Sequence, residues 1–203
     1  MFRRKANAKG DRLQGEILMK IDIGVDEMIR VLEKEEKEQD RIIQKSRELI
    51  RHCSVAIKCI HSKEIKEAKA HIAAVDKELK GLKSEKFGYM LEQTYQEVCE
   101  AKVLMAVIEK KKVPTYKQLG IPFETYLLGL CDCVGELRRE MLEQLKEGRK
   151  KEAKYYFEVM SHIYEAMIPI RFSASLLPNF RKKQDVARMQ VEHARSELMR
   201  ALS

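Results

Sequence analysis

The feature that most constrains this fold is an uninterrupted helical stretch near the start of the chain. From Val25 to Ser62 the sequence contains neither Gly nor Pro, the two residues that most often interrupt a helix. A single helix over this stretch would be roughly 57 Å long at about 1.5 Å per residue. Because such a helix needs partners for its apolar face, the stretch predicts a long helical bundle or the scaffold of an oligomer.

The few remaining helix breakers divide the rest of the chain into further helices. Only nine Gly and four Pro occur in 203 residues, which favours long helices over a sheet. The helices are predicted at about 63–80, 84–111, 123–147, 149–168 and 179–202, with one more turn over 115–119. All four prolines fall in the predicted connections: Pro114, Pro122, Pro169 and Pro178. The sequence therefore predicts an all-α, elongated bundle of about six to seven helices.

The domain organisation follows from the same pattern. Residues 1–22 are mixed and basic and are predicted to form an N-terminal arm, whereas residues 23–203 form a single helical domain. Ser62 and Ser84 are expected to cap the helices that follow them, because serine accepts hydrogen bonds from the first free amides of a helix.

The charge balance favours a polyanionic partner. The chain carries 40 Lys and Arg against 32 Asp and Glu, a formal net charge of +8, and basic surfaces attract phosphates. The first residues lack the apolar core of a secretory signal, and no apolar run is long enough to span a membrane. Five cysteines within helical patterns are expected to be reduced and mostly buried, so the expected location is cytoplasmic.

Two carboxylates stand out in the helix predicted at 84–111. One face of that helix carries a packing stripe with alternating spacings of four and three: Phe87, Leu91, Thr94, Val98, Ala101, Met105 and Ile108. A neighbouring stripe is mostly apolar at its ends and holds Glu97 and Glu100 in its middle. Since these two glutamates are three residues apart, they project from one side of the helix.

The helix predicted at 123–147 repeats this pattern. Asp132 is the only charge in the run TYLLGLCDCVG, and an aspartate in such surroundings is costly unless it is paired, hydrogen-bonded or bound to a metal. Glu136 lies one turn later on the same face, and Gly129 leaves room about one turn earlier.

If the two acidic faces meet, three or four carboxylates converge and repel one another, and a divalent cation relieves that repulsion. Oxygen ligands favour Mg²⁺ or Mn²⁺ over zinc, and such an ion can activate water for phosphoryl chemistry. Spacing alone leaves an alternative open. The pair Glu97 and Glu100 is also explained as a solvated face, and Glu136 as a surface partner of Arg139.

Four segments resemble the translin/TRAX family, and together the similarity covers about residues 25–200. They read QKSRELIRHCSVAIKCIH (44–61), QEVCEAKVL (96–104), YLLGLCDCVGELRREML (126–142) and PNFRKKQDVARMQVEHARSEL (178–198). The chain resembles TRAX at the acidic segments, whereas LGIP (119–122) is more similar to translin.

The resemblance implies a translin-like fold and an Mg²⁺-dependent endoribonuclease that cleaves single-stranded RNA. The metal site and the catalytic residues fall on Glu97, Glu100 and Asp132, with Glu136 as a further ligand or a neighbour. The family further implies a closed oligomer of eight subunits, made of this chain alone or together with a translin-type partner. The alternative is a non-catalytic RNA- or DNA-binding scaffold of the translin type, and a third hypothesis is a purely structural adaptor.

A nuclease also needs cations that hold the phosphates of its substrate. Arg47, Arg51 and Lys58 recur at spacings of four and seven on the first long helix, and Arg138 and Arg139 directly follow the acidic segment. These five residues are the predicted contacts to RNA, with solvated surface charges as the alternative.

Overall fold

The computed structural model describes residues 23–82 and 84–202, and this part of the chain contains helices and no strand. Within these described residues, seven α-helices and one short 3-10 helix follow one another: α2 (Val25–His61), α3 (Ile65–Leu79), η1 (Gly88–Leu91), α4 (Glu92–Ile108), α5 (Tyr116–Leu119), α6 (Phe123–Lys146), α7 (Lys150–Met167) and α8 (Phe180–Leu202). The all-α fold class is confirmed. The predicted N-terminal arm at residues 1–22 lies outside the described residues.

The chain divides into two compact units, residues 1–41 and residues 42–203. The described part of the first unit is the beginning of α2, where apolar side chains are exposed to solvent. Val25, Met28, Ile29 and Leu32 are between 45% and 60% exposed. Within this described part, the apolar side chains of the helix lie uncovered.

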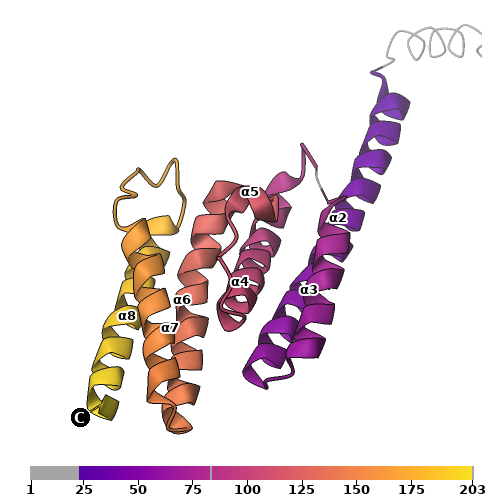
Figure 1. The fold of residues 1–203 in the computed structure, drawn as a ribbon. Coiled ribbons are helices and arrows are strands. Elements are labelled where there is room, and N and C mark those ends of the chain that lie inside the picture. The colour runs from indigo at the N-terminus through magenta and orange to yellow at the C-terminus, as the bar shows by residue number, and fades with distance from the viewer. Residues whose placement is uncertain (1–22, 83, 203) are drawn as a thin grey trace, which may run out of the picture. The chain divides into compact units, whose positions relative to one another are not determined.

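In the second unit, α6 is the central helix. It packs against α4, α7 and α8, and α7 also packs against α8 (Figure 1). Cys133, Val134, Leu137 and Met141 of α6 are fully buried in the larger of two apolar cores. The five cysteines of the chain are free and buried, as predicted.

A second, smaller core joins α2, α3 and α4. Leu49 and Cys53 of α2 and Val75 of α3 pack there with Val98 and Ala101, which belong to the predicted packing stripe of α4. The opposite side of α4 contributes to the larger core. Because both faces of α4 are used for packing, the acidic stripe between them is held in a fixed orientation.

The predicted boundaries agree with the observed ones to within two residues, except around two serines and at the end of α4, which lies at Ile108 and not at residue 111. Ser62 does not cap α3, because α2 ends in a Schellman motif that includes this residue: the amide of Glu64 donates to the carbonyl of Cys59 at 2.8 Å and that of Lys63 to the carbonyl of Ile60 at 2.9 Å. Lys63 adopts the left-handed conformation, with φ 63°, that this motif requires.

The helix predicted at 84–111 begins later than expected. Ser84 does accept a hydrogen bond from the amide of Phe87 at 3.1 Å, but this contact closes a turn. Residues 88–91 then form η1, and α4 begins only at Glu92. The predicted turn at 115–119 is α5, whose cap Thr115 and Gln118 form a reciprocal capping box. None of the helices in the described residues is apolar over a length that could cross a bilayer.

Candidate functional site

The candidate site lies where α4 and α6 pack closely together. A Cβ atom on Gly129 would lie 2.6 Å from the Cβ of Cys99 and 2.7 Å from the carbonyl oxygen of Gln96. Because no side chain fits in that space, glycine is required for the two helices to approach so closely. Glu97 and Glu100 follow Gln96 on α4, and Asp132 and Glu136 follow Gly129 on α6. Each predicted acidic pair therefore starts within three residues of the contact between Gln96 and Gly129.

The two glutamates of α4 are half-buried, and both are shifted toward the protonated form. Burial raises the pKa of Glu100 to about 8, and the negative charges of Glu97, Asp132 and Glu136 add to this shift. Burial also raises the pKa of Glu97, again with a contribution from Asp132, although the positive charge of Lys183 opposes the shift. These shifts show that the four predicted carboxylates lie near enough to repel one another electrostatically.

Asp132 is paired with a lysine. Its Oδ2 atom contacts the Nζ of Lys183 from α8, and the same ammonium donates a hydrogen bond to Oε1 of Gln96 at 2.8 Å. The Asp132 side chain is 34% exposed, so it lies at the edge of the core rather than inside it. Pairing is thus one way in which the cost expected for this aspartate is reduced.

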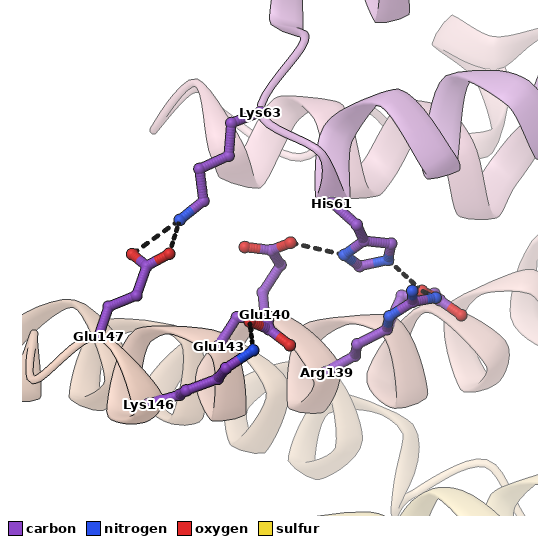
Figure 2. A network of polar contacts seen from close by, with 8 residues as sticks. His61, Lys63, Arg139, Glu140, Glu143, Lys146 and Glu147 are labelled. Carbon is purple, nitrogen blue, oxygen red and sulfur yellow. Dashed lines mark hydrogen bonds and ion pairs between the residues drawn. The ribbon is translucent and has the colours of Figure 1, made fainter.

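Glu136 belongs to a network around the buried His61, whose contact with Glu140 is shown in Figure 2. The Nε2 of His61, the last residue of α2, contacts Oε2 of Glu136, and its Nδ1 lies 2.5 Å from Oε1 of Glu140. Burial lowers the pKa of His61, but the hydrogen bonds to both carboxylates outweigh it and raise the pKa to about 9. The same hydrogen bond lowers the pKa of Glu136. The imidazolium is therefore the favoured form at neutral pH, and it holds Glu136 as a carboxylate.

The donor set suits a hard divalent cation, because all four predicted ligands are carboxylates on two adjacent helices. In the structure, however, no three of these four described side chains place oxygen atoms within 4.8 Å of one another. The two carboxylates of α6 are instead paired with cations, Asp132 with Lys183 and Glu136 with His61. In the described residues, the group that meets this distance is Cys59, Glu64 and Glu67, at the turn between α2 and α3.

Sequence analysis did not identify three residues that contact the site: His61, Glu140 and Lys183. Glu140 had a detectable signal, because it continues the spacing of four that joins Asp132 and Glu136, and it is only 3% exposed. His61 and Lys183 had none, since each reaches the site from another helix.

The predicted RNA contacts fall into two groups. Arg47, Arg51, Lys58 and Arg139 are exposed and available to a ligand. Arg138 is engaged within the bundle, where its guanidinium pairs with Glu197 and donates to Gln190 at 2.9 Å. Arg138 therefore joins α6 to α8. Arg139 lies 3.9 Å from Oε2 of Glu136, so the surface pairing considered for that glutamate is present, but it is longer than the contact with His61.

Comparison with known proteins identifies the family. The model of the translin family matches residues 15–196. The chain belongs to the translin family. A relative in Methanocaldococcus jannaschii, an uncharacterised protein, is 33% identical over 179 residues, which are 85% of this chain and 80% of that protein.

Solved structures similar to this translin-family chain include those of C3PO proteins. The structure of AfC3PO in complex with duplex RNA has a TM-score of 0.83 at 29% identity and covers 88% of this chain and 96% of its own. The crystal structure of AfC3PO has a TM-score of 0.82 at 30% identity, with 88% and 97% covered. Apo-NeC3PO, at 20% identity and a TM-score of 0.77 over 89% and 98% of the two chains, shares the fold.

Proposed function

We propose that this protein is an Mg²⁺-dependent endoribonuclease that cleaves single-stranded RNA and works in a closed oligomer. The observation that carries the proposal is the grouping of four carboxylates beside the close contact of α4 and α6, where burial raises the pKa of Glu100 to about 8. Carboxylates that repel one another at the edge of a core weaken the fold, and perturbed groups of this kind concentrate at functional sites. A bound divalent cation would neutralise the negative charge of these carboxylates and so remove their mutual repulsion.

The residues of the chain would divide the work as follows. Glu97, Glu100 and Asp132 would hold Mg²⁺, or Mn²⁺ in its place. A divalent ion bound there supplies an activated water and neutralises charge that develops on the phosphate. The hydrogen bond to His61 keeps Glu136 ionised, and this carboxylate would orient the attacking water or accept a proton from it. The exposed cations of α2 would hold the RNA backbone.

The proposals of RNA binding and of an oligomer are supported by similar proteins and by exposed surfaces of this chain. AfC3PO, whose structure is similar to that of this chain, was solved in complex with duplex RNA. For this chain the half-exposed position of Asp132 suits a backbone that can bend into the site. The uncovered apolar side chains at the start of α2 fit a contact between subunits, and eight copies, or copies together with a translin-type partner, are the proposed assembly.

A cleavage assay tests the proposal. Single-stranded RNA labelled at its 5′ end is incubated with the protein in Mg²⁺ or in EDTA. Wild type should give internal fragments in Mg²⁺ alone, whereas Asp132→Asn and Glu100→Gln should lose cleavage by at least roughly a hundredfold while keeping their helix content. The matched control is Glu143→Gln, because Glu143 is an exposed carboxylate of α6 that pairs with Lys146. Equal cleavage by wild type and Asp132→Asn would disprove the proposed chemistry.

A second candidate is a non-catalytic scaffold that binds RNA or DNA. The contacts of Lys183 with Asp132 and of His61 with Glu136 favour it, because these cations neutralise part of the acidic site without a metal. In that case RNA would bind with an affinity that falls as salt rises, and no substrate would yield products in Mg²⁺. Light scattering of the full chain distinguishes a closed assembly from a single 23.7 kDa chain under either hypothesis.

A further inference from the structure

Lys183 is the cationic side chain that contacts Asp132. Its Nζ atom touches Oδ2 of Asp132 on α6 and donates to Oε1 of Gln96 on α4 at 2.8 Å. It therefore joins α8 to both helices of the acidic site. Its side chain is 31% exposed, so the ammonium lies at the boundary between the bundle and solvent.

The charge of this ammonium acts on more of the site than Asp132. Lys183 lowers the pKa of both Glu97 and Glu100, against the larger effects of burial and of the neighbouring acids. In the described structure this lysine is thus a source of positive charge for three of the four proposed metal ligands. Any cation that binds between α4 and α6 meets it as a like charge at short range.

We propose that Lys183 is the built-in counter-ion of the acidic site and competes with a divalent cation for Asp132. This inference rests on the proposed function, since it assumes that Glu97, Glu100 and Asp132 bind Mg²⁺ or Mn²⁺. Lys183 holds Asp132 while the divalent ion is scarce, and a divalent ion binds only by taking that carboxylate from the ammonium. The lysine therefore makes cation binding weaker than the carboxylates alone would allow.

Open space beside Lys183 allows this exchange. A cavity of about 1170 Å³ adjoins the contact, and Gln96, Lys182 and Lys183 all line it. A lysine side chain that leaves Asp132 has this volume to enter, and its four-carbon stem is flexible. Removal of the ammonium from Asp132 thus needs no repacking of the core.

Titration calorimetry with MnCl₂ tests the competition directly, without RNA. Lys183→Met should bind Mn²⁺ roughly tenfold more tightly than wild type, because a like charge beside the ion is removed. Lys183→Gln is a second neutral variant that keeps a polar end for Gln96. Lys183→Arg retains the charge and should bind Mn²⁺ about as weakly as wild type.

The matched control is Lys182→Met. Lys182 is the preceding residue of α8, is exposed, lines the same cavity and makes no ion pair with any described residue. Its replacement removes the same charge from the chain, so it should change Mn²⁺ affinity less than about twofold. Circular dichroism of each variant checks that the helices are retained.

The outcomes separate the two proposals. If Mn²⁺ binds wild type, Lys183→Met and Lys183→Gln with equal affinity, the competition is disproved and the metal site stands. The same holds if the neutral variants bind Mn²⁺ more weakly, since Lys183 would then support the site. If Mn²⁺ binds none of the proteins, the proposed metal chemistry fails, and the inference fails with it.

Discussion

Gly129 and Cys99 lie so close that a Cβ atom at position 129 would be 2.6 Å from the Cβ of Cys99. A distance this short is not compatible with two side chains, so α4 and α6 would have to separate if residue 129 were alanine. We expect Gly129→Ala to lower the free energy of unfolding by about 2 kcal/mol, as overpacking does in other cores. Chemical denaturation measures this change.

Gly135 provides the matched control on the same helix. A Cβ there meets nothing within 4 Å, so Gly135→Ala should raise the free energy of unfolding by about 0.5–1 kcal/mol through helix propensity alone. If both alanine variants are stabilised, the close approach at Gly129 does not limit the packing of α4 on α6.

The network of His61 leads to a prediction about a buried charge. His61→Phe leaves the carboxylate of Glu140, a residue that is 3% exposed, without its imidazolium partner. The free energy of unfolding should therefore fall by about 3 kcal/mol at pH 7. Lys63→Ala also breaks a contact between the end of α2 and α6, the exposed pair with Glu147 (Figure 2), and should cost less than about 1 kcal/mol.

The pH dependence of that difference is fixed by the shifted pKa. The pKa of His61 is raised from 6.5 to about 9, so its contribution is complete below about pH 6.5 and is lost as the pH rises through 9. The stability gap between wild type and His61→Phe should therefore shrink above pH 9. The double variant His61→Phe/Glu140→Leu should recover most of the loss at pH 7. A double variant as unstable as the single one would contradict the buried-charge explanation.

The helices could be predicted because their signals are local. The absence of Gly and Pro defined α2, and the four prolines marked the connections. The cap predicted at Ser62 was wrong because the choice between capping one helix and ending another depends on Lys63, which adopts a conformation that glycine usually takes. Local sequence does not distinguish these two roles of a serine.

The carboxylates of the site could also be predicted, since Glu97, Glu100, Asp132 and Glu136 interrupt apolar stripes on their own helices. Their partners could not. Lys183 is 51 residues from Asp132 in the sequence, and His61 is 75 residues from Glu136. These cations reach the acids because α8 packs against α6 and the end of α2 lies in the same core as α6, and helix periodicity carries no information about that packing.

The raised pKa of Glu100 makes a prediction about stability in the absence of metal. Because its folded pKa is about 8 against 4.5 when unfolded, the folded protein holds a proton there that the unfolded chain releases. This contribution is complete below about pH 4.5 and is lost as the pH rises through 8. In EDTA at pH 8.5, Glu100→Gln should therefore melt at least about 3 °C higher than wild type, with little difference at pH 5.

Comparing the melting temperatures of wild type and Glu100→Gln at the same pH removes the effect of His61, because both proteins contain this histidine. If Mg²⁺ binds as proposed, it should raise the melting temperature of wild type at pH 8.5 and leave that of Glu100→Gln nearly unchanged. Equal melting temperatures of the two proteins at every pH, in EDTA, would show that Glu100 ionises as an ordinary surface glutamate does.

The exposed cations of α2 and the engaged Arg138 should behave differently toward RNA. Arg51 is exposed and makes no ion pair with any described residue, so a contact with phosphate would be its main interaction. Arg51→Ala should weaken binding of single-stranded RNA and reduce the slope of log affinity against log salt by about 0.7 for the lost contact.

Arg138→Ala should instead lower the melting temperature, because it breaks the pairing with Glu197 that joins α6 to α8, and leave the salt slope unchanged. Fluorescence anisotropy over a salt series measures both slopes on the same labelled RNA. A smaller slope for Arg138→Ala than for wild type would mean that this arginine leaves Glu197 to contact phosphate, as the sequence alone had predicted.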